Sequence, residues 1–197
     1  EDVKLLFGQR FHTIASLFIN GQFVHEEYGE VMFKKDGLSG IVIMNLSSLI
    51  NRQRIKEAKI YLAVLNKDQA IITVKDLFQM SQSNLNPLLS FVNEEIANYI
   101  YKRAEITPDH YFSYEECQEL AEIAAAISFT YRGSYDYEYS QVTIGGVSVD
   151  NLNDDLSSKH EEHVYFLGEI IDVDGPCGGY NLKWAIGSAA KCVEYFK

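Results

Sequence analysis

The sequence predicts an α+β protein made of two folding units, and three observations support this prediction. Two strands with a tight turn open the chain, helical periodicity dominates its middle, and a strand, a glycine-rich turn and a helix end it. The 197 residues are enough to bury a core. A content of 47% hydrophobic and 23% charged residues is typical of a folded globular protein.

The first expected element is a β-hairpin over residues 14–28. Asn20 and Gly21 separate its two apolar runs, and this dipeptide tolerates the positive φ angles of a type I′ turn. A glycine turn at 37–40 then leads into IVIMNLSSLI, for which a buried helix and a strand both remain open. The alternation and branched side chains of residues 59–65, KIYLAVL, predict another strand.

Two helices are expected in the middle of the chain. Asn86 and Pro87 supply an N-cap and a first-turn proline for a helix that runs to about Arg103. Ser113 and Glu116 form a capping box for the next helix. Apolar residues recur at helical spacing in both segments, which predicts that the helices pack against each other or against the sheet.

A change in composition near residue 140 predicts a domain boundary between 1–140 and 141–197. The second part contains two predicted strands, VTIGGVSV and VYFLGEI, then the turn DVDGPCGG and the helix YNLKWAIGSAAKCVEYF. Dinucleotide sites use this order, because backbone N–H groups and the positive end of the helix dipole face the ligand. A plain connection between sheet and helix is the alternative. The apolar helix face comprises Leu182, Ala185, Ile186, Ala189 and Val193.

Charge and cysteine usage narrow the class of partner. A net charge of −11 repels phosphate backbones and anionic lipids, so neither nucleic acid nor a membrane surface is an expected partner. The sequence has no apolar stretch of bilayer length and no signal-peptide pattern. Three cysteines without a CxxC pair argue against a disulfide framework or a zinc site, so we expect a cytoplasmic protein. Because the chain begins at Glu1 without a methionine, we also expect it to be an engineered fragment, a processed product or a segment cut out of a longer protein.

Several residues have both a chemical and a plainer interpretation. Cys177 in the glycine turn could face a bound cofactor as a redox thiol, although a lone cysteine is more often inert. His160 and His163 could bind a metal on a helix, but a solvated loop is the simpler interpretation. Four tyrosines could stack a planar substrate, while cross-strand packing explains them more simply: Tyr131, Tyr135, Tyr137 and Tyr139. Lys35 and Asp36 could contact substrate or simply stabilise their turn.

The segment FLGEIIDVDGPCGGYNLKWA, preceded by QVTIGGVSVDNLN, resembles the C-terminal signature of the BaiN-like (YhiN-like) bacterial FAD-dependent oxidoreductases, also called the aminoacetone oxidase family. GEVMFKKDGLSGIVIMNLSSLI and ISFTYRGSYDYEYSQVTIGGV are similar to further segments of that family. Residues 66–112 match only in pattern, and Ile41 stands where the family usually has proline. The resemblance thus covers most of the chain.

The resemblance implies a three-part protein. A Rossmann-like half with a GxGxxG loop comes first, an inserted small β-barrel with a helical bundle follows, and a C-terminal segment completes the Rossmann-like FAD domain. This sequence has no GxGxxG loop. Residues 1–140 therefore correspond to the insert domain and residues 141–197 to the C-terminal segment, and the chain is expected to pair with a missing N-terminal FAD-binding half or to self-associate.

The implied function is that of a fragment of an FAD-dependent oxidoreductase with a small-molecule substrate and NAD(P)H as reductant. Little FAD affinity and no activity are expected of the chain alone. A non-catalytic interaction module related to the insert domain is the alternative. No catalytic acid, base or metal ligand is identified, and the expected FAD contacts are Gly145, Gly146, Gly168, Glu169, Asp172, Gly178, Gly179, Tyr180 and Asn181.

Overall fold

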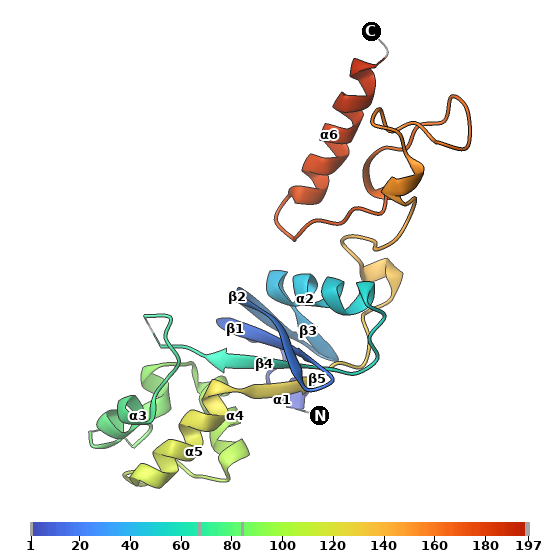
Figure 1. Cartoon of the computed structure of the whole chain (residues 1–197). Coiled ribbons are helices and arrows are strands. Elements are labelled where there is room, and N and C mark those ends of the chain that lie inside the picture. Colours follow the sequence, from blue (N-terminus) through green and yellow to red (C-terminus); the bar gives the residue numbers. More distant parts are fainter. Residues whose placement is uncertain (1, 67, 84, 196–197) are drawn as a thin grey trace. The chain divides into compact units, whose positions relative to one another are not determined.

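The computed structural model describes residues 2–66, 68–83 and 85–195, and it divides into two compact units (Figure 1). The first unit contains the chain up to Leu46 and residues Ile55–Arg132. The second contains Ser47–Arg54 and the chain from Gly133 onward. The division after Arg132 falls a few residues before the boundary near 140 that composition predicts.

A five-stranded antiparallel sheet, in the order β3-β2-β1-β4-β5, forms the framework of the first unit. The predicted hairpin is confirmed, since Asn20 and Gly21 join β1 to β2 with φ angles of 50° and 78°. The strand expected at 59–65 corresponds to β4. The small β-barrel stays a prediction, since the described ladders form an open row. The strands are β1 (Arg10–Ile19), β2 (Gln22–Lys34), β3 (Gly37–Ser39), β4 (Ala58–Val64) and β5 (Ile127–Thr130).

Helix α2 (Ile41–Arg52) resolves the choice left open for IVIMNLSSLI in favour of a helix. Its residue Val42 packs against Gly29 of β2 so closely that a Cβ at Gly29 would lie 2.7 Å from the valine methyl group. Gly40 precedes the helix with a φ of 105°, and a Cβ there would lie 2.4 Å from the carbonyl oxygen of Glu30. The turn therefore requires glycine at this position, and it forms with Ile41 in place of a proline.

Three helices pack on one another beyond the end of β4: α3 (Val74–Ser81), α4 (Glu94–Ala104) and α5 (Tyr114–Ala125). The predicted capping box of α5 is confirmed, because the Ser113 hydroxyl accepts from the Glu116 amide while the Glu116 carboxylate accepts from the Ser113 amide. Helix α3 was not predicted, although Thr73 and Asp76 form a similar box. A short helix α1 (Asp2–Leu5) precedes the sheet.

The predicted start of helix α4 was wrong. Residues Pro87–Ser90 form a separate 3₁₀ turn, and α4 begins only at Glu94. The amide oxygen of Asn86 accepts the Tyr101 hydroxyl at 2.8 Å and caps no helix. Asn93 is the actual N-cap, because its side chain accepts from the Ile96 amide at 3.0 Å.

The second unit contains one long helix, α6 (Tyr180–Glu194), and three short 3₁₀ turns, η2 (Tyr137–Tyr139), η3 (Val149–Asn151) and η4 (Gly168–Ile170). The helix is confirmed, but the two strands predicted beside it were wrong. A strand needs a ladder of backbone hydrogen bonds, and the described residues supply only isolated bridges, such as Val147 with Ile171. The small core of the second unit comprises Leu152, Leu156 and Ile171, and the residues packed around them are Val147, Phe166, Val173 and Trp184.

The apolar face of α6 and the tyrosines near residue 137 are both exposed. Helix α6 turns Ser188 and Cys192 inward, and Leu182, Ile186 and Val193 of its apolar face are 73%, 72% and 57% exposed. The tyrosines around residue 137 do not alternate along a strand, because three of them lie in or beside η2 with exposed rings. Within the described residues, no helix has the length and apolarity needed to cross a membrane.

Candidate functional site

Two of the predicted site glycines lie against the turn that contains Asp172. The Gly145 amide donates to the Asp172 carboxylate at 3.1 Å. Gly146 has a φ of 126°, and a Cβ there would lie 2.3 Å from the carbonyl oxygen of Ile170. Two backbone hydrogen bonds between Val147 and residues 170 and 172, of 2.8 and 2.9 Å, hold the segments together. The second unit therefore brings Gly145, Gly146 and Asp172 into one place.

Gly168 is fixed against helix α6 through both of its backbone polar groups. Its amide donates to the Ser188 hydroxyl at 2.9 Å, and its carbonyl oxygen accepts the Trp184 indole N–H at 3.0 Å. Gly168 has a φ of 68°, and an added Cβ would lie 3.4 Å from that of Ala185. Because Trp184 and Ser188 lie one turn apart on α6, the helix sets the position of the Gly168–Glu169 turn.

The turn before α6 is closed by Asn181. Its side-chain oxygen accepts from the Gly175 amide at 2.7 Å, while its side-chain nitrogen donates to the Gly175 carbonyl oxygen at 3.0 Å. Gly178 and Gly179 lie between these two residues with φ angles of 125° and 94°, and a Cβ at either would meet no atom within 4 Å. The closed turn thus leaves an open glycine surface at the start of the helix.

The start of α6 has the properties of a site for an electron-rich group. No side chain caps its first turn, whose first hydrogen bond runs from the Lys183 amide to the Gly179 carbonyl oxygen. The N–H groups before Lys183 are therefore free of intrahelical partners, and the helix dipole adds partial positive charge. The side chain of Tyr180 is 59% exposed beside them. The residues here that could hold the edge of an electron-rich cofactor are Gly178, Gly179 and Tyr180.

The two predicted acidic contacts are already engaged within the protein. The Glu169 carboxylate accepts from the Thr143 amide. The Asp172 carboxylate accepts from Gly145 and pairs with the Arg52 guanidinium at 3.1 Å. Glu169 remains exposed and could still accept from a ribityl or ribose hydroxyl, whereas Asp172 has a clear internal role.

Sequence reasoning missed the residues of α2 that reach this region. Arg52 also pairs with Asp174, whose carboxylate accepts the Ser48 hydroxyl. Ser48 and Arg52 are four residues apart, so they share one face of the helix. Their spacing was visible in the sequence, but nothing local indicated that this helix would meet a turn more than a hundred residues away.

The other chemical candidates gain no further support. The Cys177 thiol lies 4.0 Å from the side-chain oxygen of Gln141. His160 lies in an exposed bend, where its ring is 3.2 Å from the Asn151 side-chain oxygen. No cluster of three or more metal-ligating side chains occurs in the part of the chain that the structure describes. Burial raises the pKa of the Cys117 thiol, which disfavours the reactive thiolate.

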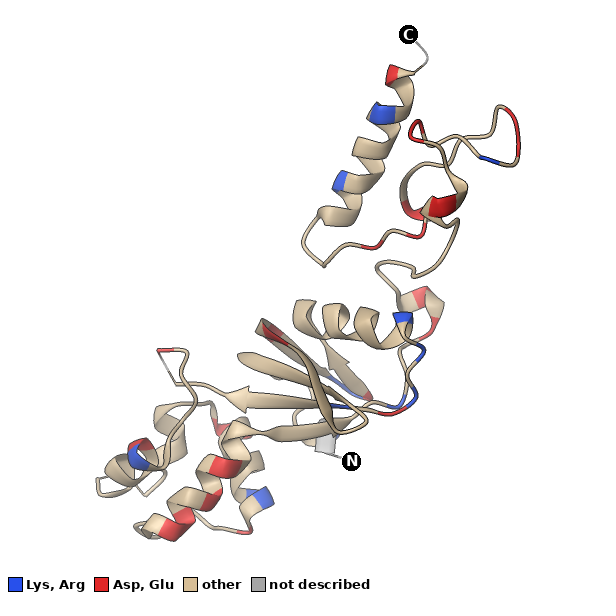
Figure 2. Ribbon diagram, in the orientation of Figure 1, with Lys and Arg blue, Asp and Glu red and all other residues tan. Residues whose placement is uncertain are grey.

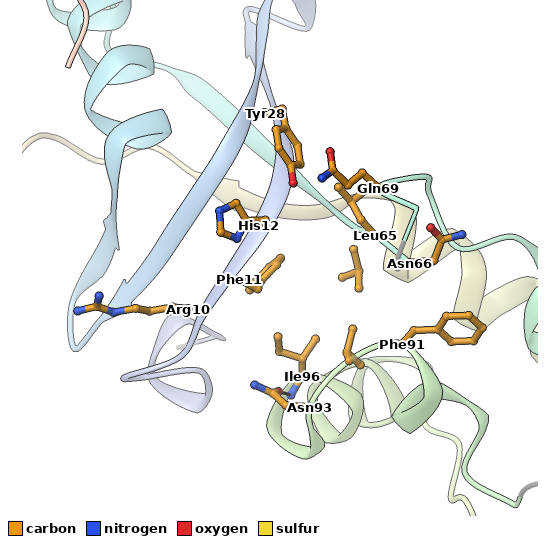
Figure 3. A pocket seen from close by; sticks show the side chains of 12 residues that line it. Arg10, Phe11, His12, Tyr28, Leu65, Asn66, Gln69, Phe91, Asn93 and Ile96 are labelled. Atoms are coloured by element: carbon orange, nitrogen blue, oxygen red, sulfur yellow. Dashed lines mark hydrogen bonds between the residues drawn. The ribbon is translucent and has the colours of Figure 1, made fainter. Parts of the chain in front are cut away.

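A cavity of about 330 Å³ lies in the first unit, and none of the predicted site residues lines it. Figure 3 shows the rings of Phe11, His12 and Tyr28 from the sheet facing Leu65 and Gln69 from the loop after β4. The His12 and Tyr28 rings are 6.0 Å apart. Gln69 has a φ of 61°, an uncommon conformation that the Asn66 side chain supports by accepting from the Ala70 amide. The remaining wall comes from the start of α4 and the turn before it.

Comparison with known proteins places nearly the whole chain in a family. The family model described as "HI0933-like protein Rossmann domain" matches residues 7–195. The chain is similar to 3-dehydro-bile acid delta(4,6)-reductase of Clostridium scindens, with 25% identity over 193 residues, which is 90% of this chain and 46% of the relative.

Two further relatives match over a shorter length. Both are named ribosomal RNA dihydrouridine synthase, from Haemophilus influenzae with 40% identity over 65 residues and from Escherichia coli with 38% identity over 63 residues. Each match covers 32% of this chain and 16% of the relative. The chain thus spans less than half the length of the curated relatives that it matches.

Proposed function

We propose, from the premise that this chain belongs to the HI0933-like family of FAD-binding oxidoreductases, that it is the insert domain and C-terminal flavin-domain segment of a BaiN-like enzyme. The observation that carries the proposal is the open pair Gly178–Gly179 at the uncapped start of α6. A bound FAD supplies two-electron transfer, and this chain's residues bind and orient it.

The role that we propose for each residue follows from the geometry of the second unit. Uncapped amides at the start of α6 stabilise electron density on the flavin edge, while the exposed Glu169 accepts from a sugar hydroxyl. Asn181 and Trp184 act indirectly, because they fix the two turns that carry these groups. The pyrophosphate clamp belongs to a separate GxGxxG-containing segment, which this sequence lacks.

We propose a small-molecule substrate and NAD(P)H as the source of electrons. Two relatives are named for dihydrouridine formation and one for a reductase activity. Dihydrouridine carries two hydrogens more than uridine, so its formation from uridine is a reduction, as is the activity for which the third relative is named. Although two of these names include ribosomal RNA, the net charge of −11 opposes a phosphate backbone. Salt-sensitive binding of ribosomal RNA to the chain would argue for a nucleic-acid substrate instead.

The cavity of the first unit is the proposed contact surface for that substrate. Its volume of about 330 Å³ is at the lower end of the range for small-molecule sites, roughly 300–1,000 Å³. Phe11 offers an apolar wall, and the side chains of His12 and Gln69 offer polar groups beside it. Substitution Gln69→Ala should raise KM in the complete enzyme and leave flavin content unchanged. The exposed substitution Gln53→Ala serves as the control.

The exposed face of α6 is the proposed contact for the missing N-terminal half. Leu182, Ile186 and Val193 follow one another at separations of four and seven residues along the helix, and each is more than half exposed. In the isolated chain such a face favours self-association. Sedimentation at increasing concentration should therefore show association that Ile186→Glu weakens. Lys183→Glu, at an exposed position of the same helix, is the control.

An FAD titration of the isolated chain tests the proposed division. Because this sequence lacks the GxGxxG segment that would bind the pyrophosphate, we expect no saturable change in flavin fluorescence. The complete gene product, in contrast, should bind FAD tightly. Stoichiometric binding by the isolated chain would contradict the proposal of an incomplete site. Absence of flavin from both would favour a non-catalytic interaction module.

A further inference from the structure

We infer that Arg52 of α2 is a positioning residue for the flavin segment: it holds the acidic turn 172–175 in place, as a clamp, and offsets part of the negative charge of its two carboxylates. The inference rests on the proposed function for its role toward FAD, but the clamp itself can be tested on this chain alone. Arg52 lies in the part of α2 that belongs to the second unit, more than a hundred residues before the turn.

One guanidinium contacts two carboxylates. Arg52 Nη2 lies 3.1 Å from Asp172 Oδ1 and also pairs with Asp174 Oδ1. The other oxygen of Asp174 accepts the Ser48 hydroxyl. A planar guanidinium can hold two carboxylates in fixed directions, which the single ammonium of lysine cannot do. The α2 face formed by Ser48 and Arg52 therefore sets the direction of both acidic side chains.

The burial of Asp174 determines how much the Arg52–Asp174 ion pair matters for stability. The side chain of Asp174 is 4% exposed, while those of Arg52 and Asp172 are 37% and 35% exposed. Removing one partner of a buried pair leaves a charge without compensation, which destabilises more than removing both. The exposed side of the cluster, Arg52 with Asp172, is worth less because water screens it. The loss of stability on replacing Arg52 should therefore come mainly from the buried, unpaired charge of Asp174.

The clamp also reaches the glycine segment. Asp172, held by Arg52, accepts from the Gly145 amide, and so the chain of contacts runs from α2 through the turn to Gly145. Without Arg52, the turn would present two uncompensated carboxylates near Glu169, a poor surroundings for the anionic FAD. Arg52 thus reduces the repulsion that this acidic segment would exert on an anionic cofactor.

A double-mutant cycle on this chain tests the clamp without any cofactor. Arg52→Gln should lower Tm by several degrees and speed hydrogen exchange at Gly145. Adding Asp174→Asn should recover most of the loss, because the buried charge is then gone while the amide oxygen still accepts from Ser48. Arg54→Gln, on a neighbouring exposed arginine, should change neither quantity.

Two outcomes would overturn the clamp. One is an Arg52→Gln variant that matches Arg54→Gln in Tm and in Gly145 exchange. The other is a double variant that is no more stable than Arg52→Gln. If Arg52→Gln does not fold, Arg52→Lys replaces it, and the same recovery by Asp174→Asn is expected from its smaller loss.

Flavin binding by the complete gene product tests the consequence for the cofactor. Arg52→Gln should weaken FAD binding on the order of tenfold, and Asp174→Asn should restore most of it. Unchanged affinity in Arg52→Gln would overturn the positioning role. A wild-type product that binds no flavin would refute the proposed function while the stability cycle still decides the clamp.

Discussion

Gly146 and Gly168 show how single residues hold the second unit together. Both have positive φ angles, of 126° and 68°, and both approach another segment closely. At Gly146 the neighbour is backbone, the carbonyl oxygen of Ile170, which cannot move aside as a side chain could. At Gly168 the neighbour is the Ala185 methyl group, at an ordinary contact distance. The two positions therefore differ in how much they tolerate a side chain.

The first prediction is that Gly146→Ala destabilises the second unit. The added Cβ would lie 2.3 Å from Ile170 O, and the φ angle is unfavourable for alanine, so a loss of about 1–3 kcal/mol in the free energy of unfolding is expected. Gly187→Ala is the control: it is helical with open space, and alanine should stabilise it by about 0.5–1 kcal/mol. Chemical denaturation of both variants checks this, and equal stabilities would contradict it.

The second prediction concerns the turn closed by Asn181. Asn181→Ala removes both hydrogen bonds to Gly175, and a loss of about 1–2 kcal/mol is expected with faster amide exchange over residues 175–181. Asn181→Asp keeps the oxygen that accepts from the Gly175 amide but loses the donor, so it should fall between alanine and wild type. Hydrogen exchange that is the same in all three would show that the turn does not depend on Asn181.

At the level of elements, side-chain caps set the starts of helices α3, α4 and α5. The third prediction is that Asn93→Ala destabilises the first unit by about 0.5–2 kcal/mol, because Asn93 caps α4. The comparison variant is Asn98→Ala, an exposed position inside the same helix, which should change stability little. Thermal unfolding of the two variants measures the difference. A larger loss at position 98 would contradict the observed helix start.

The start of α5 is surrounded by titratable groups. Figure 2 shows acidic residues along this helix, and His110 lies 2.9 Å from an Asp109 oxygen and 2.8 Å from a Glu116 oxygen. Hydrogen bonds to these carboxylates, Asp109 first, raise the pKa of His110. The Ser113 amide, more than His110, lowers the pKa of Glu116. The hydrogen bond with His110 likewise lowers the pKa of Asp109.

The fourth prediction follows from the direction of these shifts. A raised histidine pKa gives stability that is complete below its unfolded value of 6.5 and lost as pH rises through the folded value. The lowered carboxyl pKa values give stability that is present above their unfolded values and lost as pH falls. The Tm difference between wild type and His110→Ala should therefore be larger at about pH 5.5 than at about pH 8.5. A difference that grows toward alkaline pH would contradict this, and His25→Ala on β2 serves as the control.

The sequence predicted a turn or a helix start well when the residues that form it are close together in the sequence. The Asn20–Gly21 turn and the Ser113–Glu116 box depend on neighbours in sequence, and both form as predicted. Asn86 failed as a cap because Tyr101, fifteen residues away, occupies its oxygen. The exposed apolar face of α6 shows the same limitation, since periodicity finds a face but cannot determine what covers it.

At the scale of the whole molecule, distant contacts were outside what the sequence could predict. The sequence motif identified the glycine turns, but the contacts of Arg52 with Asp172 and Asp174 join residues of the second unit that are more than a hundred positions apart in the sequence. Predicted strands in the second unit failed for a related reason, because strand formation requires a partner that periodicity does not supply. The family assignment rests on nearly the whole chain, residues 7–195.

The flavin content of the complete gene product tests the central claim most directly. The protein would be purified, incubated with FAD, separated from free cofactor and scanned for the visible absorbance of bound flavin. We predict about one FAD per chain, and loss of that flavin when Gly178 and Gly179 are both replaced by valine in a variant that still folds. A folded product that retains no flavin, or a double variant that retains it fully, would contradict the assignment of this segment to a flavin site.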